Sequence, residues 1–98
     1  MMDDLTGFQR DLLYVIVGLE NGTPPHGLAI KDSLEEDYEG EIHHGRLYPN
    51  LDTLAEMGLI EVTAIDNRTN AYSVTQRGHR ELEARREWER QHVDLSSG

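Results

Sequence analysis

The amino-acid sequence predicts a mainly α-helical fold with one small β-hairpin, in the order helix, helix, helix, strand, strand, helix. Two observations carry this prediction. Apolar residues recur at the three- and four-residue spacing of a helix in three segments that precede Gly58. After Gly58, two short stretches of apolar and β-branched residues flank a polar turn, and a last segment opens with a helical N-cap.

The first helix is expected from an N-cap at Thr6 to about Glu20. The Asn-Gly pair at 21–22 ends it, and the Pro-Pro pair at 24–25 prevents its continuation. So much of its circumference is apolar that this helix is either central to the core or shared with a partner. Its apolar positions are Phe8, Leu12, Leu13, Tyr14, Val15, Ile16, Val17 and Leu19.

The second helix is expected over residues 26–37, followed by a solvent-exposed acidic turn at 35–41. The third helix is expected over residues 45–57 and ends at Gly58. Pro49 is tolerated within about the first turn, where the lost amide hydrogen bond costs little. The apolar stripe of this helix consists of Leu47, Leu51, Leu54 and Met57.

A β-hairpin is expected from strands at residues 59–64 and 71–74, joined by a turn at 67–70. Thr75 then caps a last helix from Gln76 to about His92, and residues 94–98 form a frayed tail. Three helices followed by a two-stranded hairpin make a winged helix-turn-helix.

The composition limits the functional classes that remain. A chain of 98 residues forms one small domain, and the absence of cysteine excludes disulfides and thiolate zinc sites. The longest apolar run, at 12–19, is far shorter than the roughly 20 residues of a membrane span. The acidic N-terminus does not resemble a signal peptide, so a cytoplasmic protein is expected. Without a Gly-rich phosphate loop or a nucleophile elbow, we expect neither an enzyme nor a cofactor.

The net charge allows two interpretations. Nineteen acidic residues face nine basic ones, eight arginines and Lys31, for a formal net charge of −10. This balance repels nucleic acid at long range, so the protein either does not bind DNA or is halophilic, with a surface adapted to molar salt. At about 1 M salt the Debye length is about 3 Å, so that contacts at hydrogen-bonding distance decide affinity. We favour the halophilic interpretation because the acidic excess is diffuse, whereas the motifs below are specific.

Four short motifs follow one another within the predicted elements. They are His26-Gly27-Leu28-Ala29-Ile30, Gly45-Arg46-Leu47-Tyr48-Pro49-Asn50-Leu51-Asp52-Thr53-Leu54, Gly58-Leu59-Ile60 and Ala71-Tyr72-Ser73-Val74-Thr75-Gln76-Arg77-Gly78. In this order and spacing, over residues 12–82, the chain resembles the PadR-like family of winged-helix transcriptional regulators. The resemblance implies a dimeric repressor or activator, with the first and last helices building the dimer. We therefore expect a DNA-binding domain at residues 1–75 and a dimerisation helix with a short tail at 76–98. The chain departs from the family in its short wing with one arginine, in the His-His pair at 43–44 and in its single C-terminal helix.

The candidate DNA-reading residues lie at the start of the third helix. Arg46 could contact guanine or a phosphate, or be an ordinary surface arginine. Tyr48 could contact a phosphate or a thymine methyl, or pack under the second helix, and Asn50 could read adenine or bond the backbone. His43 and His44 precede the helix, whose N-terminus favours phosphate.

Further DNA contacts are expected outside the third helix. Arg68, with Thr69 beside it, could enter the minor groove from the tip of the hairpin, or belong to a solvated turn. Lys31 on the second helix could bind a phosphate. Two-fold symmetry predicts a pseudo-palindromic operator in double-stranded DNA, with half-sites about 10 base pairs apart or a multiple of it.

Phe8, Leu12, Leu82 and Trp88 are the candidate dimer-interface residues. Trp88 is the sole tryptophan and lies on an otherwise polar helix, so we expect it to pack against the first helix of a partner, alongside Phe8 or Leu12. The alternative is packing within its own subunit.

Two other hypotheses are a metal site and a different function of the same fold. The five histidines are scattered without ligand spacing, so no metal site is expected. The alternative function is a protein-interaction module on the same fold, which uses its acidic surface. It gains if acids cover the face that Arg46, Arg68 and Lys31 share. No residue specifies a small-molecule effector.

Overall fold

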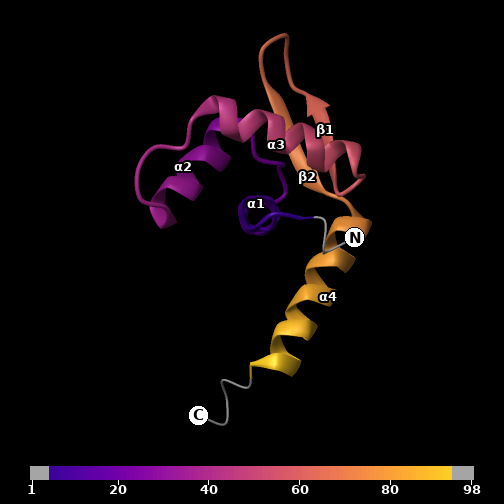
Figure 1. Ribbon diagram of the computed structural model, residues 1–98. Coiled ribbons are helices and arrows are strands. Elements are labelled where there is room, and N and C mark those ends of the chain that lie inside the picture. Colours follow the sequence, from indigo (N-terminus) through magenta and orange to yellow (C-terminus); the bar gives the residue numbers. More distant parts are fainter. Residues whose placement is uncertain (1–4, 94–98) are drawn as a thin grey trace.

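The computed structural model describes residues 5–93, and its elements follow in the predicted order (Figure 1). The first three helices are α1 (Gly7–Leu19), α2 (Gly27–Asp37) and α3 (His44–Glu56). The strands β1 (Ile60–Ala64) and β2 (Asn70–Val74) and the helix α4 (Gln76–His92) complete the fold. The predicted mainly α fold with one hairpin is confirmed. The expected frayed tail at 94–98 lies outside the described residues.

Threonine side chains cap the starts of two of the helices, α1 and α4. Thr6 accepts a hydrogen bond from the backbone N–H of Gln9, and the Gln9 side chain accepts one from the backbone N–H of Thr6, a reciprocal capping box. Thr75 caps α4 by accepting from the backbone N–H of Gly78. Both threonines occupy the N-cap positions that the sequence predicted.

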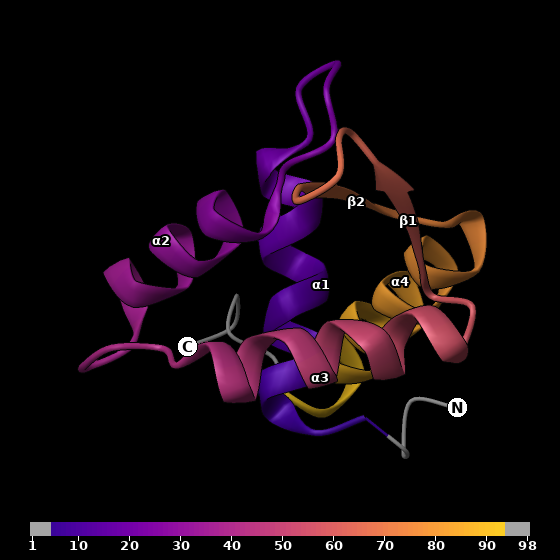
Figure 2. The ribbon, with the colours of Figure 1, turned by 90° about the horizontal axis from the view of Figure 1, so that it is seen from above.

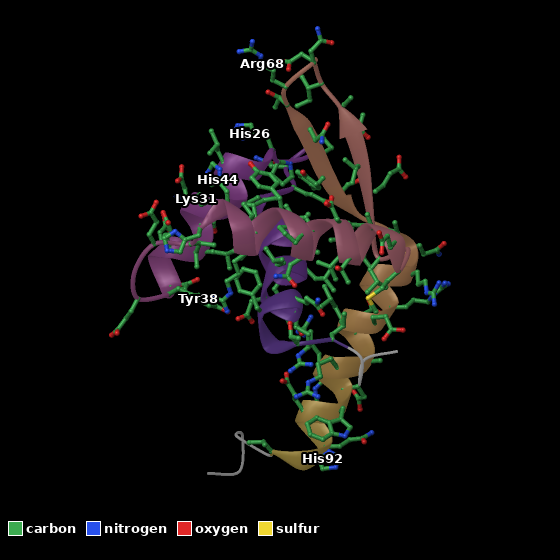
Figure 3. The ribbon with its side chains drawn as sticks, turned by 45° about the horizontal axis from the view of Figure 1, so that its top comes forward. His26, Lys31, Tyr38, His44, Arg68 and His92 are labelled. Carbon is green, nitrogen blue, oxygen red and sulfur yellow. The ribbon has the colours of Figure 1, made fainter. Side chains whose placement is uncertain are left out.

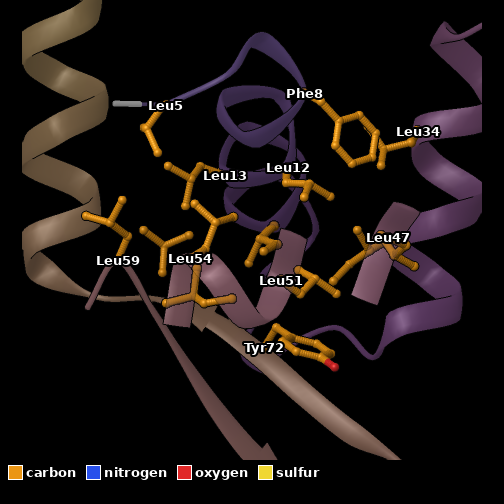
Figure 4. Close-up of a cluster of buried hydrophobic side chains, with 14 of the residues drawn as sticks. Leu5, Phe8, Leu12, Leu13, Leu34, Leu47, Leu51, Leu54, Leu59 and Tyr72 are labelled. Carbon is orange, nitrogen blue, oxygen red and sulfur yellow. The ribbon is translucent and has the colours of Figure 1, made fainter. Parts of the chain in front are cut away.

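Helix α1 is the centre of the core (Figure 2), because it contacts α2, α3, β2 and α4. Of the two alternatives for this apolar helix, the central position is therefore the one observed. Burying one leucine or isoleucine side chain contributes about 1.5–3 kcal/mol, so the cluster around α1 supplies most of the driving force for folding. Figure 4 shows part of this cluster, which comprises Leu5, Phe8, Leu12, Leu13, Ile16, Ile30, Leu34, Ile42, Leu47, Leu51, Leu54, Leu59, Ile60, Tyr72, Val74 and Leu82.

The hairpin, residues 60–74, forms a wing that is only half attached to the core. The strands are antiparallel, in a register that pairs Ile60 with Val74 and Ala64 with Asn70. On β2 the side chains of residues 71, 72 and 74 are buried, whereas on β1 only Ile60 is buried. The hairpin extends beyond the helices (Figure 1), so Val62 has no apolar surface to cover it and is 39% exposed.

Helix α4 joins the core through its first turns and then projects from it (Figure 1). Gly78 lies so close to the chain before β1 that a Cβ atom there would be 2.3 Å from the carbonyl oxygen of Leu59. Leu82 is the last buried residue of the helix. From residue 83 to residue 93, every side chain is exposed except Arg85, which is half-buried.

Candidate nucleic-acid interface

The orientation of α3 follows from its apolar stripe. Leu47, Leu51 and Leu54 are fully buried against the core. With about 100° between successive residues, the opposite side of the helix faces solvent. The side chains on that solvent-facing side are exposed: Gly45, Pro49, Asp52, Thr53 and Glu56. These exposed positions were not predicted from the sequence, although their three- and four-residue spacing, offset from the buried leucines, is visible there.

Arg46 and Tyr48 lie on opposite flanks of this exposed side, because residues two apart on a helix do not face each other. The guanidinium carbon of Arg46 is 4.0 Å from the centroid of the Phe8 ring and 5.8 Å from that of Tyr38. The Tyr38 hydroxyl donates a hydrogen bond to the Asp11 carboxylate, which, together with burial, raises the pKa of Tyr38. The arginine is exposed yet held over a ring on α1, which limits the orientations from which it can reach a ligand.

Asn50 is engaged inside the protein at both ends of its amide group. Its Oδ1 accepts a hydrogen bond from Gln9 Nε2 at 3.0 Å, and its Nδ2 donates to the Arg46 carbonyl oxygen at 2.7 Å. Gln9 is itself buried. Asn50 therefore ties α3 to α1, a structural role that the sequence analysis did not consider.

A groove of about 460 Å³ lies between the start of α2, the first half of α3 and the wing. It brings together four of the predicted DNA-contacting residues, namely His44, Tyr48, Arg68 and Thr69. Figure 3 shows His26 and His44 near each other beneath the wing, with Arg68 at its tip. The other residues of the groove were not predicted as DNA contacts from the sequence; they are His26, Gly27, Leu28, Asp52, Asn70 and Tyr72.

Tyr48 is half-buried against the start of α2, the packing that was one of its two predicted alternatives, and it also lines the groove, so its contact with DNA stays a prediction. A Cβ atom on Gly27 would lie 2.6 Å from its hydroxyl oxygen, so the phenol packs directly against the start of α2. The ring of His44 meets it edge-on, with 5.5 Å between the centroids. Burial raises the pKa of the nearby Tyr72, so this second phenol of the groove stays neutral.

Lys31 is not among the residues that line the groove, and it is paired with acids. Its ammonium nitrogen is 3.0 Å from a Glu35 carboxylate oxygen and 3.9 Å from one of Glu41. The hydrogen bond with Glu35 raises the pKa of Lys31. Any phosphate contact of Lys31 would therefore compete with these two glutamates. His43 is the exposed N-cap residue of α3 and makes no side-chain cap bond.

Three of the four candidate dimer residues belong to the core of their own protomer. Phe8 and Leu82 are buried, and Leu12 has no exposed surface. Leu12 therefore has no surface to offer a partner in this conformation, because the core of its own subunit already covers it. Trp88 is 47% exposed and packs within its own helix, stacked on His92 at 4.2 Å and against the Arg85 guanidinium at 4.4 Å.

The structure of residues 5–93 also bears on metal binding and on membrane insertion. No group of three or more His, Cys, Asp or Glu side chains in this part of the chain could hold a metal ion. None of its helices combines the length and the apolar character needed to cross a membrane.

Comparisons with known proteins agree with this architecture. The model of the transcriptional regulator PadR-like family matches residues 13–84. RosR of H. salinarum, crystallised from NaBr, is 43% identical over 98% of this chain and 84% of its own, with a TM-score of 0.87. The hsRosR–S1 complex gives the same identity and TM-score. A PadR family regulator from Clostridium difficile is 19% identical over 90% of this chain and 94% of its own, with a TM-score of 0.68, and so shares the fold. Among curated protein sequences, none matches this chain.

Proposed function

This chain belongs to the PadR-like family of transcriptional regulators, and we propose that it acts as a homodimeric repressor at a pseudo-palindromic operator in double-stranded DNA. DNA binding and transcriptional regulation follow from the family and the winged-helix fold. The family and fold are those of regulators and not of enzymes, and the absence of catalytic activity is part of the proposal.

The observation that carries the proposal is the exposed side of α3 beside a groove that the wing completes. In the helix-turn-helix geometry the third helix enters the major groove, and its first turns approach the base edges. Gly45 and Pro49 leave the start of α3 without bulky side chains on its exposed side, so that its backbone can come close to the DNA. Arg46 on one flank and the groove with Arg68 on the other would then face the two strands of DNA.

The exposed half of α4 supports the proposal of a homodimer. It projects from the body of the protomer and carries Trp88, and 47% of the Trp88 surface is open to solvent. Val93 at its end is 53% exposed, and Tyr14 on α1 is 38% exposed. A partner that covers these three side chains would bury the large apolar groups that this part of the protomer leaves in water.

The acidic surface is consistent with function at high salt. With a net charge of −10, the protein would be repelled by DNA in dilute buffer. The 43%-identical RosR comes from H. salinarum, a halophile, which supports a halophilic, cytoplasmic regulator here too. At about 1 M salt, screening over about 3 Å removes most of the repulsion and leaves the local contacts.

The test of DNA binding is selection from a genomic DNA library in molar KCl, with a low-salt control. Enrichment of a palindromic motif supports the proposal and gives the operator directly. If folded protein enriches no duplex at any salt, the proposed repressor is rejected, and the acidic protein-interaction module becomes the function to test.

The homodimer is tested separately by sedimentation equilibrium in the same salt. We expect the wild type to sediment as a dimer and the Trp88→Ala variant as a monomer. Val62→Ala, which removes a comparably exposed apolar side chain from the wing, is the matched control and should stay dimeric. A dimeric Trp88→Ala variant would refute the role of Trp88 as the interface anchor.

A further inference from the structure

Backbone hydrogen bonds attach one wall of the groove, the start of α2 at His26, to strand β2 of the wing. The carbonyl oxygen of Pro25 accepts a hydrogen bond from the Tyr72 N–H at 2.8 Å. His26 itself forms an isolated antiparallel bridge with Ala71. These backbone contacts attach the start of α2 to β2, so His26 keeps a fixed position relative to the wing.

The ring of His26 has a defined hydrogen-bonding pattern. Its Nδ1 accepts a hydrogen bond from the backbone N–H of Ala29 at 3.3 Å, and this bond caps α2. A nitrogen that accepts cannot carry the proton, so the neutral ring carries its hydrogen on Nε2. Protonation of Nδ1 would remove this cap. With Nδ1 engaged in the cap, the exposed His26 ring has its Nε2–H as the donor available in the groove.

The other residues of the groove suit an anion whose negative charge lies on oxygen atoms. Arg68 supplies a cation from the wing, and His44 and Thr69 add polar hydrogen-bonding groups. Among the described residues that line the groove, Asp52 is the one carboxylate, and it lies on the wall formed by α3. An anion would therefore be favoured on the side of α2 and the wing, where His26 lies.

We propose that His26 donates its Nε2–H to a phosphate of the DNA backbone, as an uncharged phosphate contact in the groove beside the recognition helix. This inference rests on the proposed function, because a strand of DNA passes between α3 and the wing only if α3 enters the major groove. The contact specifies position and not sequence.

An uncharged donor has a distinct thermodynamic signature. Each cationic side chain that binds a phosphate releases counterions from the DNA. The logarithm of affinity therefore falls linearly with the logarithm of salt concentration, and each such contact adds about 0.9 to the steepness of the slope. A hydrogen bond from a neutral imidazole adds affinity without adding to this slope. Such a contact keeps its strength in molar salt, in a protein whose one lysine is paired with two glutamates.

The experiment compares His26→Ser with wild type on the duplex that the wild type enriches from the genomic library. Serine still caps a helix, so α2 is retained while the imidazole is lost. We expect affinity to fall about tenfold at every KCl concentration, at pH about 8, with an unchanged salt slope. His79→Ser, the same change at an exposed position on α4, should alter neither quantity. Arg68→Gln should weaken binding and reduce the slope by about 0.9.

The outcomes separate this inference from the proposed function. Wild type that binds no duplex rejects both. Wild type that binds, with a folded His26→Ser variant of equal affinity, overturns the inference alone, and a reduced slope in that variant shows a cationic contact and also overturns it. If His26→Ser fails to fold, ring ¹⁵N NMR of the wild type decides. An Nε2–H signal that shifts on addition of the duplex supports the contact, and an unshifted signal overturns it.

Discussion

The substitution Gly78→Ala tests the close contact that attaches α4 to the rest of the fold. Within a helix, glycine to alanine normally stabilises by about 1 kcal/mol. Here the added Cβ would lie 2.3 Å from the carbonyl oxygen of Leu59 and 2.6 Å from Cγ1 of Val74. The Leu59 oxygen cannot easily move away, because it accepts a hydrogen bond from the Thr75 N–H at 3.0 Å.

The expected net effect of Gly78→Ala is therefore a loss of stability. Overpacking of this kind costs about 1–3 kcal/mol, and a contact with fixed backbone belongs at the upper end of that range. After the helix-propensity gain, we expect a net loss of about 1–2 kcal/mol, or a Tm lower by about 5–15 °C.

The assay is urea unfolding at constant protein concentration in molar KCl, because a dimer's stability depends on concentration. Gly18→Ala in α1 is the matched control, since a Cβ there meets no atom within 4 Å. Gly18→Ala should be neutral or more stable by up to about 1 kcal/mol. A Gly78→Ala variant as stable as Gly18→Ala would refute the close approach of α4 to Leu59.

Three further predictions concern the recognition helix and its support. Arg46→Ala should weaken specific DNA binding about tenfold to a hundredfold in a gel-shift titration, and unchanged affinity would exclude Arg46 as a reader. Asn50→Ala should reduce the free energy of unfolding by about 1–3 kcal/mol, because it leaves the buried Gln9 amide without its acceptor. Asn50→Ala should leave the selected DNA motif unchanged, and a changed motif would show that Asn50 reads bases. The backbone N–H of Ile42 lowers the pKa of Glu35, so ionised Glu35 stabilises the fold above its unfolded pKa. Near neutral pH the wild type should therefore be more stable than Glu35→Gln. This difference should disappear in urea unfolding as the pH falls through the lowered folded pKa of Glu35, and a difference that persists in acid would contradict the prediction.

The element order was predictable because it depends on local signals. The buried leucines of α3 are three or four residues apart, and Thr6 and Thr75 each cap a backbone N–H three residues further on. Such short spacings can be recognised in the sequence itself. The predicted strands, too, lie within one residue of their observed bounds. Histidine is not a usual N-cap residue, so the sequence placed His26 at the start of α2 without revealing its bond to the Ala29 N–H.

The site was less predictable because its contacts join elements far apart in sequence. The guanidinium of Arg46 lies over the Phe8 ring, and the Gln9 side chain donates a hydrogen bond to Asn50. Both contacts depend on the angle at which α1 crosses α3. The apolar circumference of α1 fitted a dimer interface as well as a core. Only the packing of helices around it decided that Leu12 belongs to the core.

The exposed half of α4 has a geometric consequence for the proposed dimer. At 1.5 Å per residue, residues 83–92 extend about 15 Å beyond Leu82, the last anchored side chain. A tilt of about 10° at this attachment displaces the far end of α4 by about 2.6 Å, and two-fold symmetry doubles the change between protomers. This exceeds the rise of about 3.4 Å per base pair. The helix would thus serve as a lever arm, which converts a small change of tilt at its attachment into a shift of several ångströms between the protomers.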